Sequence, residues 1–334
     1  MIHVFKGETA NDVWKEAFFN FQDDDFTLIH QGRGGGTKEI LHAAFCIEKP
    51  LQRWVLAREP AINPAFALAE VLWILNGQNN SAFLNSWNTQ LPRFAGSGQT
   101  YHGAYGFRLR NHFQVDQLNR AYQALKNNPE SRQVVLLIWD PVVDLPNTKG
   151  KPANRDIPCN LMSMLKIRNN KLEWTQIMRS NDLFKGTPYN FIQFTYLHEV
   201  IAGWLDIEVG SYNHFSDSLH YYLQDEESGF NISDIDIVPN PDTLFLPKNK
   251  SESVFKTLYN NVQLLVTQEL DTDQFLKKAD ANYLPLAYKN MFLVMLAEAA
   301  RRKKFFELAQ DIIAECSNPV LVQAWQRWFL RFHE

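Results

Sequence analysis

The chain has 334 residues, of which 45% are hydrophobic and 21% are charged. A chain of this length and composition can bury the core of one large or two modest globular domains, which excludes an intrinsically disordered protein. The net charge of -4, with Lys and Arg scattered along the sequence, offers no broad basic surface to a nucleic acid polymer. Any phosphate that the protein recognises is therefore expected to belong to a small ligand held by a few arginines.

The cysteines and the apolar runs indicate where the protein resides. Cys46, Cys159 and Cys316 lie far apart and form no Cys-x-x-Cys pair, which argues for a reducing compartment and against structural zinc. The N-terminus lacks a basic segment followed by an apolar stretch, and the sequence has no run of about 18 apolar residues. We expect a cytoplasmic protein that holds no metal and binds no membrane and no nucleic acid polymer.

The first half of the chain predicts helices alternating with strands and two glycine-containing turns. Apolar residues at helical spacing predict helices over residues 11–21, 65–75 and 116–126, and apolar runs predict strands over 39–47 and 134–139, the latter buried on both faces. Arg33 lies in a glycine-rich loop, residues 31–37, whose backbone amides could approach an anion. Glu70 stands inside the apolar pattern of its helix, either paired structurally or as a proton-handling group.

A hairpin is predicted for residues 161–178, with the turn at Asn169-Asn170 because asparagine tolerates positive φ. If Arg168 pairs with Lys171, constant register places Asn160 opposite Arg179 and Cys159 opposite Ser180. A thiol would then lie beside a guanidinium and a hydroxyl. An adjacent cation favours the nucleophilic thiolate form of cysteine.

The second half of the chain becomes helical towards its end. A long apolar helix is predicted over residues 189–204 and a strand over 209–215, followed by helices over 254–267, 286–302, 305–316 and 320–332. We therefore predict a catalytic domain over residues 1–250 and a helical C-terminal extension over 251–334. The basic cluster Arg301-Arg302-Lys303-Lys304 is interpreted as a solvated bend between two helices.

Several short motifs resemble those of the thymidylate synthase family, which includes pyrimidine nucleotide hydroxymethylases, and they occur in the same order along the chain. The most specific are Pro158-Cys159, then Arg179-Ser180-Asn181-Asp182 and Gly186-Thr187-Pro188-Tyr189-Asn190. The others are Ala69-Glu70-Val71-Leu72-Trp73, Ala104-Tyr105-Gly106, Asp116-Gln117 with Ser131-Arg132, and Leu219-His220-Tyr221-Tyr222. The resemblance covers about residues 10–245. It implies an α/β fold in which one large, mostly mixed sheet packs against helices, and a homodimer formed sheet to sheet.

The resemblance also implies the catalytic chemistry. Cys159 would add to C6 of a pyrimidine nucleoside 5'-monophosphate, after which C5 could accept a one-carbon unit from 5,10-methylenetetrahydrofolate. Glu70 would organise protons and water, and Tyr105 would join the water network that removes the C5 proton. Asn190 would read the edge of the pyrimidine.

The remaining site residues are implied to bind the substrate and the folate. The substrate-binding residues are Arg33, Arg179 and Ser180 on the 5'-phosphate, Arg132 reaching that phosphate from the other subunit, His220 and Tyr222 on the sugar hydroxyl, and Asn160 beside the base. Asp182 would face the pterin of the folate, with Gly186 close by. No metal ligand is implied.

Several residues depart from the family pattern. Asn160 stands where thymidylate synthases usually have His, Gln133 replaces a second arginine, and Lys185 occupies a normally apolar position. A Trp expected near Leu91 is missing, and helices replace the short C-terminal segment that closes over folate. Hydride transfer needs a closed, dry site, whereas hydroxymethylation needs water at the same methylene. The departures therefore favour hydroxymethylation slightly over reductive methylation.

Two questions stay open at the level of sequence. The amide of Asn190 can present either its oxygen or its nitrogen, so the base could be uracil or cytosine. A non-catalytic nucleotide-binding relative that recruits a partner through its helical tail is the alternative of a different class. The retained Cys159 and Glu70 argue against that alternative, because a pure binding protein needs no thiol.

Overall fold

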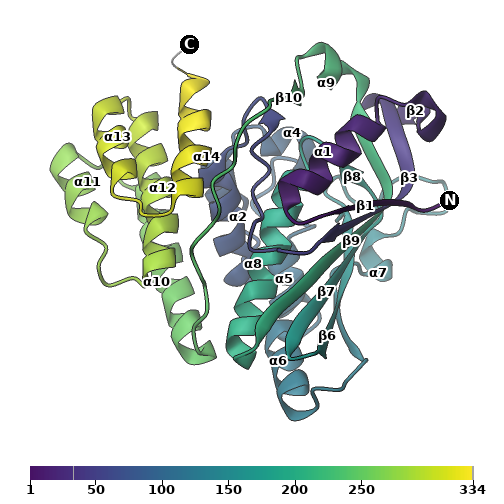
Figure 1. Ribbon diagram of the computed structural model, residues 1–334, viewed down its shortest axis with the longest axis horizontal. Helices are drawn as coiled ribbons and strands as arrows, with labels where there is room; N and C mark the ends of the chain where they lie inside the picture. The colour runs from purple at the N-terminus through teal and green to yellow at the C-terminus, as the bar shows by residue number, and fades with distance from the viewer. Residues whose placement is uncertain (33, 333–334) are drawn as a thin grey trace.

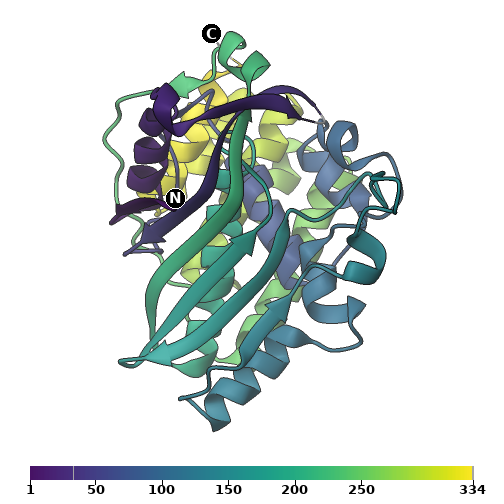
Figure 2. The same cartoon turned by 90° about the vertical axis from the view of Figure 1, so that its right-hand side faces the viewer.

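Most of the helices cover one face of a large mixed β-sheet, and this arrangement confirms the predicted α/β fold (Figures 1 and 2). The computed structural model of the protein describes residues 1–32 and 34–332. The sheet has eight strands: β1 (His3–Gly7), β3 (Gly35–Ile47), β9 (Glu208–Tyr222), β7 (Lys171–Met178), β6 (Asn160–Arg168) and β5 (Val134–Leu137) in that order, with β2 (Leu28–Gly32) on β3 and β8 (Asn181–Asp182) on β9. The pairs β1–β3, β7–β9 and β8–β9 are parallel and the others are antiparallel. A small second sheet pairs β4 (Arg58–Glu59) with β10 (Asn231–Ile232).

The helices fall into two groups along the chain. The first group comprises α1 (Ala10–Asn20), α2 (Pro64–Leu75), α3 (Ser81–Trp87), α4 (Leu91–Ala95), α5 (Tyr105–Phe107), α6 (Gln117–Asn127), α7 (Pro141–Asp144), α8 (Thr187–Leu205) and α9 (Leu223–Glu227). The second group, called here the C-terminal helices, comprises α10 (Lys248–Thr267), α11 (Thr272–Ala279), α12 (Leu286–Arg302), α13 (Phe306–Ala314) and α14 (Pro319–Leu330). Short 3₁₀ and π turns cover Asp24–Phe26 and Arg108–His112.

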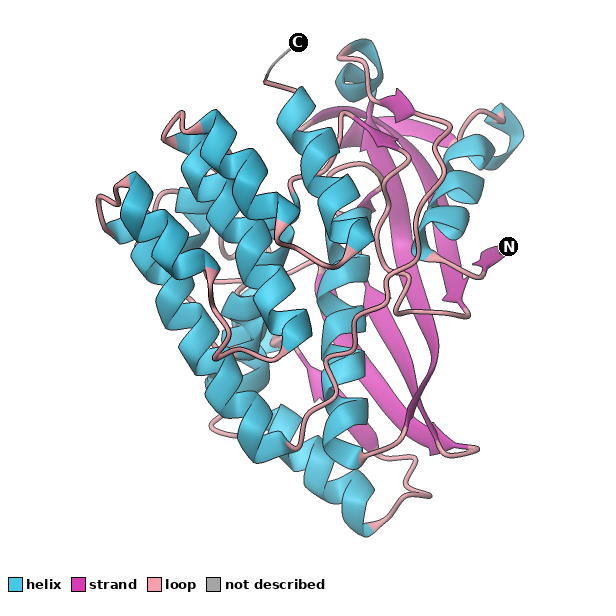
Figure 3. Ribbon diagram, turned by 60° about the vertical axis from the view of Figure 1, so that its left-hand side comes forward, coloured by secondary structure: helices cyan, strands magenta, loops and turns pink. Residues whose placement is uncertain are grey.

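The C-terminal helices pack on the far side of α2 and so form a third layer behind the sheet and its helices (Figure 3). The sequence of α2 is apolar on all sides, which is typical of a helix surrounded by protein. Helix α8 lies on one side of it, and α10, α12 and α14 lie against it from the other side. Buried side chains of both groups of helices belong to one continuous core. The division into two domains at residue 250 stays a prediction.

The predicted helices over 11–21, 65–75 and 116–126 are found as α1, α2 and α6 with shifts of one or two residues. The side chains of Thr9, Asn63 and Asp116 cap their N-termini by accepting a backbone N–H. Helix α11 was missed, because its eight residues are mostly polar. The strand predicted over 209–215 extends along the whole of β9, residues 208–222.

The prediction that the strand at 134–139 is buried on both faces is wrong. Strand β5 alternates: Val134 and Leu136 are buried, whereas Val135 and Leu137 are 42% and 45% exposed. The outer face of the sheet carries no helix over this region (Figure 2). An apolar outer face on a strand of this kind is typical of a surface that contacts another chain.

The predicted hairpin is present, but its register changes at the nucleophile end. Arg168 pairs with Lys171 across Asn169-Asn170, which both have positive φ (50° and 57°), as expected. A bulge between Asn160 and Met162 then shifts the register, so that Asn160 lies opposite Met178 rather than Arg179. The predicted partner of Cys159, Ser180, is therefore wrong. The backbone N–H of Arg179 donates to the carbonyl of Cys159 (3.0 Å).

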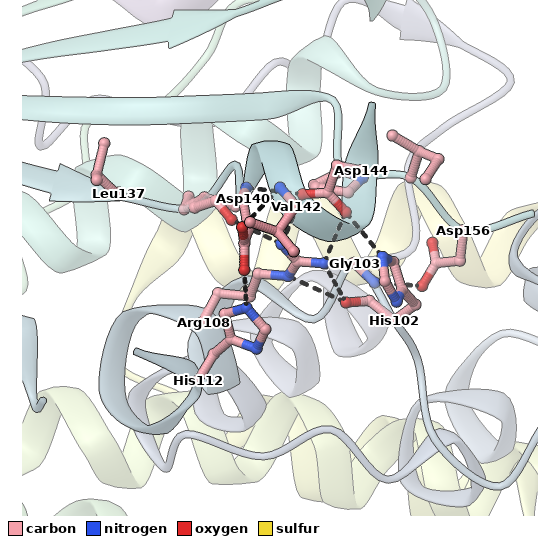
Figure 4. Close-up of polar contacts among 12 residues, drawn as sticks. His102, Gly103, Arg108, His112, Leu137, Asp140, Val142, Asp144 and Asp156 are labelled. Atoms are coloured by element: carbon pink, nitrogen blue, oxygen red, sulfur yellow. Dashed lines mark hydrogen bonds and ion pairs between the residues drawn. The ribbon is translucent and has the colours of Figure 1, made fainter. Parts of the chain in front are cut away.

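A buried ion-pair network anchors the segment that leads into α5 (Figure 4). The guanidinium of Arg108 forms two bonds with the carboxylate of Asp144 (2.6 and 2.9 Å) and donates to the carbonyl of His102. The ring of His102 also contacts Asp144, at 2.7 Å. The neighbouring N–H of Gly103 donates to Asp156 (2.8 Å). This network joins α5 to the loop that ends at the hairpin.

Asp144→Asn is expected to destabilise the protein strongly. Arg108 is 1% exposed and Asp144 is also 1% exposed, so the substitution leaves a buried guanidinium without its carboxylate. Removing one partner of such a pair costs about 3–5 kcal/mol of unfolding free energy, measurable by urea denaturation. Asp217→Asn breaks the exposed pair with His42 and should change stability by less than about 1 kcal/mol. Equal losses of unfolding free energy in Asp144→Asn and Asp217→Asn would contradict the view that the buried pair stabilises the protein more than the exposed pair.

Candidate active site

The predicted site residues converge on one cavity of about 1710 Å³, which lies between the ends of the central strands, α2 and the C-terminal helices. Pockets for single small ligands usually measure about 300–1,000 Å³, so this cavity has room for two. The predicted residues that line it are Glu70, Tyr105, Cys159, Arg179, Ser180, Asp182, Gly186, Asn190, His220 and Tyr222.

Cys159 sits at the start of β6, directly under the guanidinium of Arg179. The distance from Arg179 Nη2 to Cys159 Sγ is 3.8 Å. Arg179 is held there because it donates to the carbonyls of Ile157 (3.2 Å) and Pro158 (3.1 Å), and its guanidinium lies over the ring of Trp139. The prediction that a guanidinium lies beside the thiol is thus confirmed, although a bulge in β6 and not the predicted register places it there.

Glu70 is a half-buried carboxyl group on the wall of the cavity. It projects from α2, where its surroundings are otherwise apolar, and its residual exposure is to the cavity. Burial raises the pKa of Glu70 to about 8, and a hydrogen bond from Gln193 Nε2 (3.1 Å) opposes that shift. The group is therefore protonated at neutral pH and can donate a proton.

Asn190 and Tyr105 complete the wall around the thiol. The amide of Asn190 lies in the first turns of α8, 7% exposed. Burial raises the pKa of Tyr105, and a hydrogen bond with Asn160 acts in the opposite direction. Helix α5 can approach α2 this closely because Gly106 has no side chain: a Cβ there would lie 2.4 Å from the carbonyl oxygen of Ile74. Asn160 is fully buried and lies behind Asn190 rather than on the cavity surface.

A second group of predicted residues surrounds the ends of β8 and β9. Ser180 Oγ lies 3.5 Å from His220 Nδ1, and the rings of His220 and Tyr222 contact edge to face. Asp182 pairs with His220 in the parallel bridge of β8 with β9. These residues come together because β9 continues well beyond its predicted end.

Asp182 and Gly186 shape the turn from β8 into α8. Burial raises the pKa of Asp182, while the N–H groups of Phe184 (2.8 Å) and Lys185 (2.7 Å) donate to its carboxylate. Gly186 packs against Asn181, whose Oδ1 would lie 2.8 Å from a Cβ at position 186. The ammonium group of Lys185 pairs with Asp225 (2.6 Å), so the charge at this normally apolar position is compensated.

The C-terminal helices contribute to the cavity, which sequence reasoning missed. Their lining residues are Arg301, Arg302, Trp328, Arg331 and Phe332. The interpretation of the basic cluster as a solvated bend is wrong for Arg301 and Arg302, which share the buried carboxylate of Glu298 at 2.7 Å. Arg302 also donates to the carbonyls of Ser86 and Trp87. The helical spacing of Arg301 and Arg302 from Glu298 indicates that they form ion pairs with it. No local feature of the sequence indicates that the two arginines line the cavity.

One predicted phosphate ligand, Arg132, is not brought to the cavity within this subunit. Arg132 is exposed in the loop before β5 and is not among the described residues that line the cavity. Arg33 lies outside the described residues. Trp87, whose ring faces Arg302, lines the cavity in the region where a family Trp was expected.

Residues 1–32 and 34–332 contain neither a cluster of metal-ligating side chains nor a helix that could span a membrane. No group of three or more His, Cys, Asp or Glu side chains there could hold a metal ion. In the same part of the chain, no helix is long and apolar enough to cross a membrane.

Comparison with known proteins identifies the family. Residues 37–274 match the family model described as thymidylate synthase. A deoxyuridylate hydroxymethyltransferase of Bacillus phage SP01 is 39% identical over 215 residues, covering 60% of this chain and 55% of that protein. A putative thymidylate synthase of Methanothermobacter thermautotrophicus is 30% identical, covering 63% and 89%. A thymidylate synthase of Francisella tularensis subsp. holarctica is 26% identical, covering 74% and 92%. The chain spans about half the length of the phage relatives it matches. It belongs to the thymidylate synthase family.

Proposed function

We propose that the protein transfers a one-carbon unit to C5 of a pyrimidine nucleoside 5'-monophosphate and that the product carries a hydroxymethyl group. The observation that carries this proposal is the cavity in which Cys159, Arg179, Glu70 and Asn190 meet. Relatives named deoxyuridylate hydroxymethyltransferase, 39% identical to this chain, favour deoxyuridylate as the nucleotide.

Each of the predicted site residues in the cavity has a role in the proposed reaction. The thiolate of Cys159 adds to C6, which transfers electron density to C5 and to the oxygen on C4. Glu70, protonated because burial raises its pKa to about 8, donates its proton through water towards that oxygen. Arg179 and Ser180 hold the 5'-phosphate, His220 and Tyr222 hold the sugar, and Asn190 holds the base edge. C5 then forms a bond to the one-carbon unit of the folate. Removal of the C5 proton through the Tyr105 water network releases tetrahydrofolate and leaves an exocyclic methylene. Addition of water to that methylene with expulsion of the Cys159 thiolate restores the aromatic ring and gives the hydroxymethyl group.

The proposed reaction balances without an oxidant or a reductant. Methylenetetrahydrofolate supplies a one-carbon unit at the oxidation level of formaldehyde, and water supplies the hydroxyl oxygen. Reductive methylation would also consume a hydride from the folate and yield dihydrofolate. The cavity suits water capture because Glu70 and Gln193 form a polar pair within its apolar wall.

The site is not left open by the absence of the usual closing segment, because residues of the C-terminal helices line the cavity. Although the helices do replace the usual C-terminal segment, α12 and α14 border the cavity themselves. The preference for hydroxymethylation therefore rests on the relatives and on the polar pair within the cavity, not on an open site.

The cavity walls fit a folate beside the nucleotide. Among the residues that line the cavity, the aromatic side chains of Tyr189 and Trp328 are suited to pack against a pterin ring, and Asp182 and Gly186 line the same cavity. We propose that the C-terminal helices complete this second subsite.

Arg58 and Arg331 would hold the carboxylates of the folate. Both border the cavity, and in the described residues they bond backbone carbonyls, of Pro60 (2.6 Å) and Ala61 (2.9 Å), rather than carboxylates. Burial lowers the pKa of both guanidinium groups. An anionic ligand would compensate this desolvation.

Arg331→Gln is therefore expected to raise the KM for methylenetetrahydrofolate about tenfold or more, because one charge-assisted hydrogen bond to the folate is lost. The KM for the nucleotide should not change. Lys303→Gln is the matched control, since Lys303 pairs with Glu269 (2.6 Å) away from the cavity. Equal folate KM values for the two variants would show that α14 takes no part in folate binding.

A homodimer is proposed through the outer face of the sheet. Partly exposed apolar side chains gather there: Val135, Leu137, Met162, Met164, Ile177 and Phe215. Arg132 directly precedes β5, whose exposed side chains belong to this surface. In such a dimer, Arg132 of one subunit could reach the phosphate bound in the cavity of the other subunit.

Mixing two inactive variants tests the shared site. Arg132→Ala and Cys159→Ala homodimers should each be impaired, whereas subunits exchanged between them should regain activity. A mixed dimer has one site with both the thiol and the partner's intact arginine. Leu137→Lys should elute as a monomer in gel filtration. If activity does not return although exchange of subunits is verified, Arg132 does not act across the interface.

A panel of nucleotides tests the proposed function. The protein is incubated with methylenetetrahydrofolate and each of dUMP, dCMP, UMP and CMP. A product heavier by one CH2O unit without dihydrofolate supports hydroxymethylation, and release of dihydrofolate supports reductive methylation. Nucleotide binding without release of tritium from C5 would support the non-catalytic alternative.

A further inference from the structure

A continuous chain of buried hydrogen bonds runs behind the cavity and passes through Asn190. We call it the amide relay. From donor to acceptor it reads Trp174 Nε1 to Gln176 Oε1 (3.2 Å), Gln176 Nε2 to Asn160 Oδ1 (2.8 Å), Asn160 Nδ2 to Asn190 Oδ1 (3.3 Å), Asn190 Nδ2 to Asn181 Oδ1 (3.0 Å) and Asn181 Nδ2 to His214 Nε2 (3.2 Å). Every member is at most 7% exposed.

The relay can run in only one direction because it starts at an indole. The N–H of Trp174 can donate but cannot accept. Gln176 must therefore turn its oxygen to Trp174 and its NH2 to Asn160, and each following amide is oriented by the one before it. Ser163 Oγ, 2.6 Å from Gln176 Oε1, can donate to the same oxygen.

The far end of the relay is compatible with this direction. His214 has to accept at Nε2 and therefore carries its proton on Nδ1, which lies 3.0 Å from the hydroxyl of Tyr212. Burial lowers the pKa of His214 to about 3, so the ring stays neutral in the physiological range. A neutral ring with Nδ1–H is the one state that satisfies both neighbours.

Asn190 is thereby held in a single orientation. Its oxygen accepts from Asn160 and its nitrogen donates to Asn181, which leaves one lone pair and one N–H for a ligand in the cavity. A half-turn of the amide would place donor against donor at Asn160 and acceptor against acceptor at Asn181. Both mismatches would be buried, where unpaired polar groups are most costly.

A fixed amide can pair with only one of the two pyrimidine edges. Uracil presents a donor at N3 and an acceptor at C4, and cytosine presents the reverse. We infer that Trp174, acting through the amide relay, is the positioning residue that commits the site to uracil and excludes cytosine. This inference rests on the proposed function for the presence of a pyrimidine against Asn190 and for the choice of uracil.

Binding of dUMP and dCMP to the protein alone, measured by titration calorimetry, tests the inference without any turnover. A site that is built to hydrogen-bond one ligand can discriminate against a mismatched ligand by a factor of about 10⁴–10⁵. We expect Trp174→Phe, which removes the donor and keeps an aromatic ring, to reduce the ratio of dUMP to dCMP affinity at least about tenfold. Gln176→Met, which cuts the relay without removing an aromatic side chain, should do the same.

The control is Trp204→Phe, which removes another buried indole donor, 2.6 Å from Ser251 Oγ and outside the cavity. An unchanged affinity ratio in folded Trp174→Phe and Gln176→Met proteins would overturn the inference and leave the proposed function intact. Failure of the wild-type protein to bind either nucleotide would refute the proposed function and the inference together.

Nitrogen NMR of the unliganded protein gives a test that needs no nucleotide. The relay requires His214 to be protonated at Nδ1 and unprotonated at Nε2. The opposite tautomer would overturn the direction of the relay whatever the protein binds.

Discussion

Cys159→Ala is expected to lower turnover at least about 10⁴-fold, as removal of a covalent nucleophile does in other enzymes. C5 of a pyrimidine is a poor nucleophile until a group adds to C6, and Cys159 is the thiol that lines the described cavity. The nucleotide should still bind, because the contacts proposed for Arg179, Ser180 and Asn190 do not require the thiol. Steady-state rates measure overall turnover, and release of tritium from C5-labelled nucleotide measures removal of the C5 proton.

Cys46→Ala and Cys316→Ala serve as controls for the loss of a thiol. Cys46 lies on β3 and Cys316 is buried among the C-terminal helices, and neither lines the cavity in the described part of the chain. Both variants should retain turnover. Substantial tritium release by Cys159→Ala would refute the covalent route.

Glu70→Gln is expected to lower kcat by about 10²–10⁴, the usual contribution of a positioned proton donor. Because burial raises the pKa of Glu70 to about 8, the wild-type rate should decline as pH rises through about 8, where the carboxyl loses its proton. Glutamine cannot titrate, so the variant should lack this decline. Gln193→Leu removes the hydrogen bond that lowers this pKa and should move the decline to higher pH.

The same group links stability to pH. The folded protein keeps the Glu70 proton that the unfolded chain releases above the ordinary carboxyl value of 4.5. Its contribution to stability is therefore fully present below about pH 4.5, falls as pH rises from there, and is lost once pH passes about 8. Glu70→Gln should flatten this part of the stability curve. An unchanged decline in both rate and stability would assign the titration to another group.

The sequence predicted the site better than it predicted the contacts that orient the site. The motifs that line the cavity come from the middle of α2, the starts of β6, α5 and α8, and the ends of β7, β8 and β9. The register at Cys159 was wrong, since a one-residue bulge has no local signature in Asn160-Leu161-Met162. That bulge is what brings Arg179 to the thiol.

Long-range burial explains the other differences. Asn160 looked like a simple replacement of a histidine beside the base, yet it is a link in the amide relay. Its partners Gln176 and Asn190 come from β7 and α8, so no spacing in the sequence connects them. The wall formed by Arg331 and Trp328 was missed for the same reason: nothing in α14 itself shows that it packs beside α2.

The origin of the oxygen in the product tests the central claim most directly. The protein is incubated with dUMP and methylenetetrahydrofolate in water enriched in the heavy oxygen isotope, and the nucleotide is analysed by mass spectrometry. We predict a product heavier by one CH2O unit that carries the heavy oxygen, with no dihydrofolate formed. A product heavier by CH2 alone, accompanied by dihydrofolate, would contradict water capture.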